Sequence, residues 1–498
     1  MFKRKLIFGI VSGWGTQVIS LAIGIFTMPL FFRYLPKDEL GVWMFILGTG
    51  VFVDLADFGF SPVLIRSLSF ELGKGDKESK KNFEGSSYFY SLSQYISSFS
   101  APILCFGMVV LGGIFIWSLK LPLHLQRPAL YAWLIFSLAQ GLSCRYRYLE
   151  TTLTSHGEVG WQNWVQMVLQ LFSLGAYFVV LNCFDGGVAG LSLVILARNA
   201  IYALWLGSLV SRRIDSKYRV KEKVSWNDVK PHIKPALDMF LISLGAFLVL
   251  NTDQYFIVQF LGSPALPDYA AAYRLVQVVF TFASTASAMC IPFIARKSAA
   301  GDSSGVHELL LINTTVGMLI QMGAVAVIAV FGDYIIQIWL GENHFIGWNV
   351  LWVFCIMLSL ENHHVIFARF GLSATIDPTW GKMSILSGLI NLILTFIAIQ
   401  HLGLLGVALS TLIAQLMTNN WYAVAKTLRI IKMEFHKYLL RSGLFWFGCG
   451  AITLIFLHYV RESISSTFVS LAVGSCISVV SCGSAVLIFF KNRIWMKK

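Results

Sequence analysis

Several long apolar runs of this sequence contain arginine, a side chain that rarely lies among hydrophobic residues without a reason. The most central of these arginines are Arg145, Arg198 and Arg274. A charge at the middle of a membrane helix costs about 2.5–3.5 kcal/mol on insertion scales, so we expect these side chains to face a bundle interior or a water-filled cavity. Because a guanidinium binds phosphate oxygens through paired hydrogen bonds, such a cavity is suited to a phosphate or diphosphate group.

Carboxylates occur in the same apolar runs. Asp54 and Asp57 are three residues apart and therefore share one helical face, which makes them candidates for binding a coupling proton or sodium ion. Asp253 is predicted at a depth similar to that of Arg274, so an ion pair between them is an equal alternative to a binding role. The candidates for contact with a bound ligand are Arg145, Arg198, Arg274, Asp57, Asp253 and Glu361.

Charge counting alone does not identify the ligand. Six arginines lie inside the apolar runs, and so do six carboxylates: Asp54, Asp57, Glu150, Asp238, Asp253 and Glu361. An arginine-rich cavity would favour a diphosphate, whereas a carboxylate-lined cavity would favour an organic cation. Both ligand classes remain open at this level.

The elements that must position these residues are membrane helices. Hydrophobic residues make up 56% of the 498 residues and charged residues only 13%, about half the charged share of a soluble domain. Apolar runs long enough to cross a bilayer recur along the chain. They predict an all-α integral membrane protein with about 14 transmembrane helices, near 6–32, 41–64, 88–118, 128–152, 161–182, 186–210, 236–261, 268–294, 308–332, 346–369, 383–400, 403–425, 439–460 and 466–490.

The positive charges indicate the orientation. The connections on the side of the N-terminus hold 27 of the 38 lysines and arginines, and those on the opposite side hold 5. Because basic loops stay in the cytoplasm, both termini are expected inside, in a bacterial inner membrane. The net charge of +13 is then a topology signal, and we expect no nucleic-acid partner.

A weak internal repeat predicts two lobes. Pro62-Val-Leu-Ile-Arg66 and Pro292-Phe-Ile-Ala-Arg296 each end the second helix of a six-helix block. Both blocks start on the same side, which is typical of parallel repeats with the transport path between the halves. We therefore expect a six-helix lobe over 1–210, a basic cytoplasmic linker over 211–235, a second six-helix lobe over 236–425, and two further helices with a tail over 426–498.

The sequence lacks the usual signatures of catalysis. No phosphate-binding G-x-x-x-x-G-K-[ST] loop occurs, and the eight cysteines form no C-x-x-C pair. No external connection is long enough for a catalytic domain, although catalytic groups usually lie on such loops. We expect a transporter rather than an enzyme, without cofactor or metal.

Two stretches carry a family resemblance. The segments Pro29-Leu-Phe-Phe-Arg33-Tyr34-Leu35, Glu39-Leu-Gly41 and Asp57-Phe-Gly59-Phe-Ser61, with Thr252-Asp253-Gln254 and Tyr273-Arg274-Leu275 further on, resemble bacterial polysaccharide repeat-unit flippases, including O-antigen flippases. These belong to the multidrug, oligosaccharidyl-lipid and polysaccharide exporter superfamily. The resemblance implies alternating access around a cationic cavity, with Arg274 at a cavity position.

The implied function is translocation of undecaprenyl-pyrophosphate-linked oligosaccharide from the cytoplasmic to the periplasmic leaflet, as in lipopolysaccharide biosynthesis. The partners would be this substrate, membrane lipids and other polysaccharide assembly proteins. The first apolar run carries no charge between Leu6 and Phe32, unlike the peptidoglycan-precursor flippases, which argues against lipid II as the cargo. The alternative is a cation-coupled multidrug exporter of the same superfamily.

Overall fold

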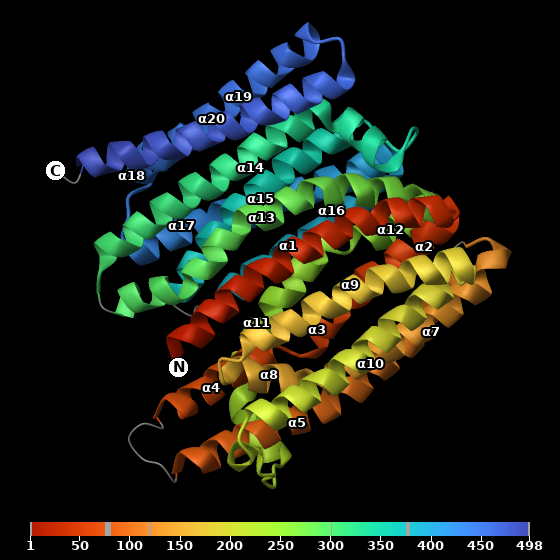
Figure 1. The fold of residues 1–498 in the computed structure, drawn as a ribbon, viewed down its shortest axis with the longest axis vertical. Coiled ribbons are helices and arrows are strands. Elements are labelled where there is room, and N and C mark those ends of the chain that lie inside the picture. Colours follow the sequence, from red (N-terminus) through yellow and green to blue (C-terminus); the bar gives the residue numbers. More distant parts are fainter. Residues whose placement is uncertain (1, 75–80, 119–120, 300, 375–378, 497–498) are drawn as a thin grey trace. The chain divides into compact units, whose positions relative to one another are not determined.

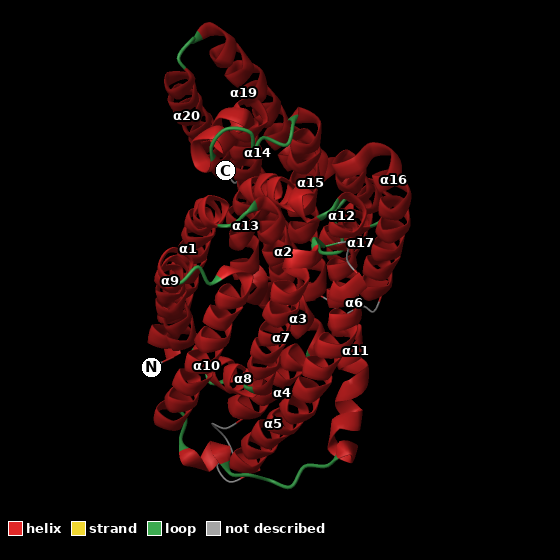
Figure 2. Ribbon diagram, turned by 90° about the vertical axis from the view of Figure 1, so that its right-hand side faces the viewer, coloured by secondary structure: helices red, strands yellow, loops and turns green. Residues whose placement is uncertain are grey.

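The computed structural model describes the backbone of residues 2–74, 81–118, 121–299, 301–374 and 379–496. Within these ranges every regular element is a helix (Figure 2). Ten helical stretches in this described part are long and apolar enough to cross a membrane by length and composition. The prediction of an all-α membrane protein is confirmed, and the broken helices described below bring the spans close to the expected fourteen.

The chain forms two compact units. Unit 1 comprises Met1–Phe247 and Ile257–Pro267, and unit 2 comprises Leu248–Phe256 and Asp268–Lys498. Each unit has its own buried core, so each is described by itself.

Unit 1 consists of helices that pack side by side. Within it, α10 lies along α7 and α9, and α1 lies along α9 (Figure 1). Its elements are α1 (Phe2–Tyr34), α2 (Lys37–Gly48), η1 (Thr49–Val51), α3 (Phe52–Ala56), α4 (Phe60–Lys74), α5 (Lys81–Gly107), η2 (Met108–Gly112), α6 (Gly113–Ser118), α7 (Leu123–Arg145), α8 (Arg147–Ser155), α9 (Val159–Cys183), α10 (Gly187–Arg213), η3 (Ser216–Arg219), most of α11 (Trp226–Leu250) and η4 (Ser263–Ala265).

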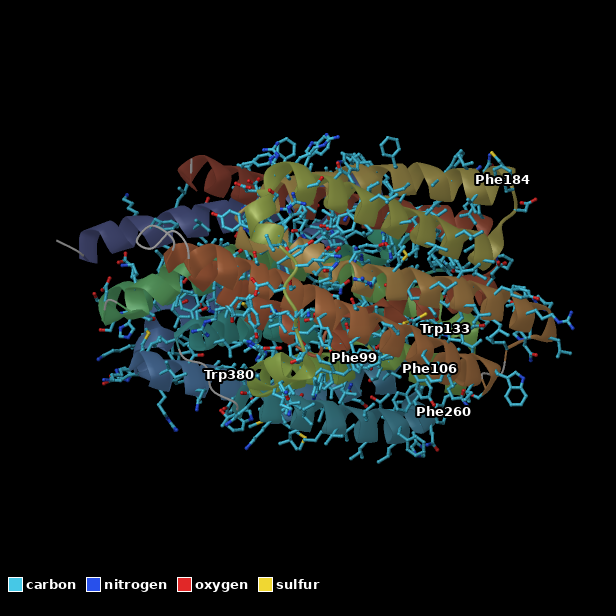
Figure 3. All side chains as sticks on the ribbon, turned by 90° about the horizontal axis from the view of Figure 1, so that it is seen from below. Phe99, Phe106, Trp133, Phe184, Phe260 and Trp380 are labelled. Atoms are coloured by element: carbon cyan, nitrogen blue, oxygen red, sulfur yellow. The ribbon has the colours of Figure 1, made fainter. Side chains whose placement is uncertain are left out.

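Aromatic residues of unit 1 occupy both its interior and its outer surface. Trp133 is 2% exposed and its indole N–H donates to the carbonyl of Met108, whereas Phe106 is 71% exposed and Phe184 is 74% exposed (Figure 3). Large exposed apolar side chains are unfavourable in water but not in hydrocarbon, which is as apolar as they are. This distribution therefore fits a protein whose outer surface meets lipid.

A turn between α3 and α4 interrupts the second predicted span. Phe58 and Gly59 have φ angles of +48° and +75°, in the left-handed region that favours glycine. A Cβ atom at Gly59 would lie 2.2 Å from the carbonyl oxygen of Ala236 on α11. Position 59 therefore needs glycine for its backbone conformation and for the close approach of α11.

An alanine in the left-handed conformation costs roughly 1–2 kcal/mol. We expect Gly59→Ala to lower the stability of the protein by more than this, because the new methyl group also overlaps a carbonyl group. Gly157→Ala is the matched control, since Gly157 has φ of +73° and open space around its Cβ position. Thermal unfolding of both variants in one detergent measures the difference. Equal falls in melting temperature would contradict the close packing at Gly59.

Unit 2 is built around α14, which lies beside α15, α19 and α20 (Figure 1). Small residues allow this packing: a Cβ atom at Gly323 of α14 would lie 2.2 Å from the Sγ atom of Cys482 on α20. The elements of the unit are α12 (Asp253–Leu261, which ends in unit 1), α13 (Leu266–Ala299), α14 (Ser303–Leu340), α15 (Trp348–Ala374), α16 (Thr379–Met417), α17 (Asn419–Ile431), α18 (Phe435–Tyr438), η5 (Leu439–Gly443), α19 (Leu444–Ser463) and α20 (Thr467–Met496).

The start of α14 has its own cap. An Asp302 carboxylate oxygen accepts the backbone N–H of Gly305 at 2.8 Å, and the other accepts Lys297 Nζ at 2.6 Å. The hydrogen bond from Lys297 lowers the pKa of Asp302 to about 2. The residue therefore stays ionised and satisfies an N–H group that the first helical turn leaves free.

One hydropathy segment differs from its helix for a physical reason, and one unusual boundary is confirmed. The helix of the seventh span begins at Trp226, not near 236, because its first turns are too polar to register as apolar although they are helical. The boundary expected between 400 and 403 is real: Gly403 has φ of +55° and breaks α16 into two helical parts. The side chains of Pro292 and Arg296, which carry half of the predicted repeat, lie outside the described residues.

Candidate functional site

Asp57 caps a helix. Its two carboxylate oxygens accept the Ser61 hydroxyl at 2.6 Å and the Ser61 backbone N–H at 2.8 Å, at the start of α4 just beyond the turn. A helix start leaves N–H groups without partners, and an aspartate at this place satisfies one. Asp57 thus has a structural role that is sufficient to explain it. The side chain of Asp54, the other predicted coupling residue, lies outside the described residues.

Arg145 lies at a second helix break in unit 1. It ends α7, and Tyr146 leaves helical geometry with φ of −101° and ψ of 8° before α8 begins. The Arg145 guanidinium carbon is 5.8 Å from the ring centroids of both Tyr146 and Tyr148, which is cation–π distance. Its Nη1 atom is buried and has no hydrogen-bond partner in the described part of the chain. A buried donor without an acceptor is unusual and is available to a ligand.

Arg198 lies near the middle of α10. Its Nε and Nη2 atoms donate to Oδ1 of the neighbouring Asn199 at 3.4 and 3.2 Å, and Asn199 in turn donates to the Ala139 carbonyl of α7 at 3.0 Å. This contact places Arg198 at the level of residue 139, about 9 Å along α7 from Arg145. The nearby Glu150 accepts the hydroxyl of Tyr202 at 2.8 Å.

Arg145, Arg198 and Arg274 share one property. Among the residues that the structure describes, none of them forms an ion pair with a carboxylate. A cation held at membrane depth normally pairs with an anion. The two arginines of unit 1 therefore present positive charge that the described residues do not neutralise.

In unit 2, Asp253 follows the break between α11 and α12 and is buried. Its Oδ2 atom accepts the hydroxyl of Tyr269 at 2.8 Å, and Thr411 Oγ1 lies 3.4 Å from both carboxylate oxygens. Thr411 is also 3.2 Å from Asn391 Oδ1, and Asn391 donates to the Leu248 and Val249 carbonyls at the end of α11.

One hydroxyl donor near Asp253 is shared among several acceptors. Thr411 Oγ1 is within 3.5 Å of four oxygens, two of Asp253, one of Asn391 and the Val407 carbonyl, yet a hydroxyl carries one hydrogen. Thr395 places a further hydroxyl 3.3 Å from Asn391 Oδ1. A buried carboxylate whose partners are all neutral is stabilised further by a proton or by a small cation. The described residues contain no cluster of three or more His, Cys, Asp or Glu suited to a transition metal.

Arg274 and Glu361 lie in the same unit. Arg274 Nη1 donates to Gln277 Oε1 at 2.9 Å, and it forms no ion pair with Asp253, so the alternative of a structural pair between them is not realised in the described residues. Tyr273 lies within electrostatic range of Asp253, Arg274 and Glu361. These three predicted residues thus lie in one unit and act electrostatically on one tyrosine, while Arg145, Arg198 and Asp57 belong to unit 1.

Sequence reasoning did not find the partners of these charges. Tyr269, Asn391, Thr395 and Thr411 are uncharged, so a search for intramembrane charges passes over them. Two helix breaks in the sequence could have indicated these partners. Asn251 and Thr252 interrupt the apolar run just before Asp253, and Gly403 interrupts the run that contains Asn391 and Thr411. Broken membrane helices are where transporters bind ions and substrates.

Comparison with known proteins places this chain among glycan-related membrane proteins. Residues 31–346 match a family described as "Polysaccharide biosynthesis protein". One relative is described as the probable low-salt glycan biosynthesis flippase Agl15 of Haloferax volcanii, 26% identical over 234 residues that cover 45% of this chain and 48% of that protein. The chain therefore aligns with about half the length of that relative.

Solved structures share the fold. A lipid II flippase, MurJ, in an inward closed conformation matches with a TM-score of 0.71 at 15% identity, covering 98% of this chain and all of that one. An inward-facing multidrug resistance transporter of the MATE family matches with a TM-score of 0.66 at 12% identity, over 84% of this chain and 96% of that one. The Vibrio cholerae MATE transporter VcmN, in its bent form, matches with a TM-score of 0.57 at 15% identity. This match covers 88% of this chain and 96% of that one. At these identities the likeness concerns the fold.

Proposed function

The chain belongs to the polysaccharide biosynthesis protein family, and from that premise we propose that it moves a lipid-linked oligosaccharide across the membrane. The proposed substrate is an undecaprenyl-pyrophosphate-linked repeat unit of O-antigen or a related surface polysaccharide. It would pass by alternating access from the cytoplasmic to the periplasmic leaflet of a bacterial inner membrane, with both termini of the protein in the cytoplasm.

One observation carries this proposal. Arg145 and Arg198, which the sequence predicts at membrane depth, have no carboxylate partner among the described residues. A guanidinium in a low-dielectric environment attracts an anion strongly, and two arginines at different depths offer several donors to a diphosphate. Arg274 of unit 2, which donates to a neutral glutamine, is left out of this argument because it belongs to the other unit.

The direct test is a deletion strain without a redundant flippase. We expect surface polysaccharide to be lost and lipid-linked repeat units to accumulate on the cytoplasmic face, where added glycosidase cannot reach them in intact spheroplasts. Complementation with the full chain should restore both. Repeat units that accumulate on the periplasmic face would indicate a polymerisation defect instead, and normal surface polysaccharide would contradict the proposal.

A second candidate function is cation-coupled drug export. The fold likeness to MATE transporters and the buried Asp253 favour it, since a carboxylate in an acceptor-rich site is suited to a coupling ion. The same deletion strain separates the two functions. Sensitivity to cationic drugs without loss of surface polysaccharide would favour drug export, whereas polysaccharide loss without drug sensitivity supports the flippase.

A further inference from the structure

A groove opens on the outer surface of unit 2 between α17 and α19. It has a volume of about 730 Å³, and the half-buried His363 of α15, which forms a hydrogen bond with the Tyr438 hydroxyl at 2.6 Å, belongs to its lining. We call it the α17–α19 groove. The lining residues used below are Trp421, Ala425, Arg429, Trp446 and Phe447.

The groove runs from the membrane surface into the hydrocarbon. Arg429 lies two residues before the end of α17, which also ends a candidate span at Ile431. Trp421 precedes Arg429 by eight residues, or about 12 Å along the helix. Trp421 and Phe447 are more than half exposed. The groove thus has a cation at the membrane interface and apolar walls toward the hydrocarbon. A phospholipid has the complementary arrangement, with a charged headgroup at the interface and acyl chains in the hydrocarbon.

The mouth of the groove carries the positive charge of Arg429. Arg429 has no ion pair with any described carboxylate, and Lys426, Lys432 and Lys437 lie in the same short stretch of sequence. The nearby Glu434 pairs with Lys437 instead of Arg429, at 3.0 Å. The hydrogen bond from Lys437 lowers the pKa of Glu434 and keeps its carboxylate ionised. Arg429 therefore offers its charge at the mouth of the groove, and it complements an anionic headgroup.

We propose that the α17–α19 groove binds an anionic membrane phospholipid, with its phosphate on Arg429 and an acyl chain between Trp421 and Phe447. The open, membrane-facing position means that the surrounding bilayer supplies the occupant, and bulk phospholipids are the most concentrated species there. This inference does not depend on the transported substrate.

The test uses the full chain in proteoliposomes that contain a phosphatidylglycerol or a phosphatidylethanolamine carrying a photoactivatable diazirine in one acyl chain. We expect the label on α17 and α19, and about fivefold more labelling by phosphatidylglycerol than by phosphatidylethanolamine. This is the factor by which one basic residue strengthens the binding of an anionic lipid at a membrane surface. Arg429→Gln should abolish that preference. Ala425→Phe, which fills the groove, should reduce labelling by both lipids.

Arg212→Gln is the matched control, because Arg212 is exposed at the end of α10 and its replacement removes the same charge from another helix. It should leave the preference intact. Melting temperatures establish that each variant is folded. Equal labelling by the two lipids in the unmodified protein, or a preference that survives Arg429→Gln, would overturn the proposal. Displacement of the label by low concentrations of undecaprenyl phosphate would also overturn it, since the groove would then hold the polyprenyl tail.

Discussion

Arg198→Ala is expected to reduce transport of the lipid-linked substrate by about 10- to 100-fold, because a hydrogen bond to a charged group is worth about 1.5–3 kcal/mol. The side chain lies at membrane depth and its described contacts are with the neutral Asn199. Arg198→Lys keeps the charge but loses the planar pair of donors, so it should retain part of the activity. Transport is measured as protection of labelled oligosaccharide in proteoliposomes.

The stability of the same variant separates binding from structure. If Arg198 serves the ligand, its removal takes an unpaired cation out of the membrane, and the melting temperature should stay the same or rise. Asn199 keeps its own bond to Ala139, so the α7–α10 contact survives. Arg212→Ala, at the exposed end of the same helix, is the control and should transport normally. A fall in protein abundance that matches the fall in transport would assign Arg198 a structural role.

The helices of this protein could be predicted because insertion into a bilayer depends on local composition. The apolar runs identified nearly all spans, including the boundary at Gly403, since each run is decided by about 20 neighbouring residues. The breaks inside spans were harder. Asp57, Gly59 and Ser61 carry the signals of a turn and a helix cap. The surrounding hydrophobicity hides these signals, so hydropathy predicts a single helix over 41–64.

The charged residues of the site could also be predicted, but not their partners. Asp253 and Arg274 stand out because charge is rare in an apolar run, and their similar depth makes an ion pair between them an equal alternative to a binding role. The structure gives Asp253 three neutral partners instead, of which Asn391 and Thr411 lie well over 100 residues away in the sequence. Such partners depend on how the start of α12 packs against α13 and α16. No local pattern contains that information.

Asp253→Asn is expected to separate transport from its driving ion. The asparagine side chain has nearly the same shape and its oxygen still accepts from Tyr269, so the protein should fold. It carries no negative charge, so the attraction of the site for a proton or a small cation is reduced. We expect transport by the unmodified chain to accelerate when a sodium or proton gradient is imposed on proteoliposomes, and transport by Asp253→Asn to be slow and insensitive to either gradient.

Thermal unfolding distinguishes the two ions. If sodium binds at Asp253, sodium chloride should raise the melting temperature of the unmodified chain relative to choline chloride, because a ligand that binds only the folded state stabilises it by mass action. Asp253→Asn should lose this shift. Asp185→Asn is the control, since Asp185 is exposed in the loop before α10 and asparagine tolerates its φ of +46°. An ion dependence that persists in Asp253→Asn would place the coupling site elsewhere, and a gradient effect without any sodium shift would identify the proton as the coupling ion.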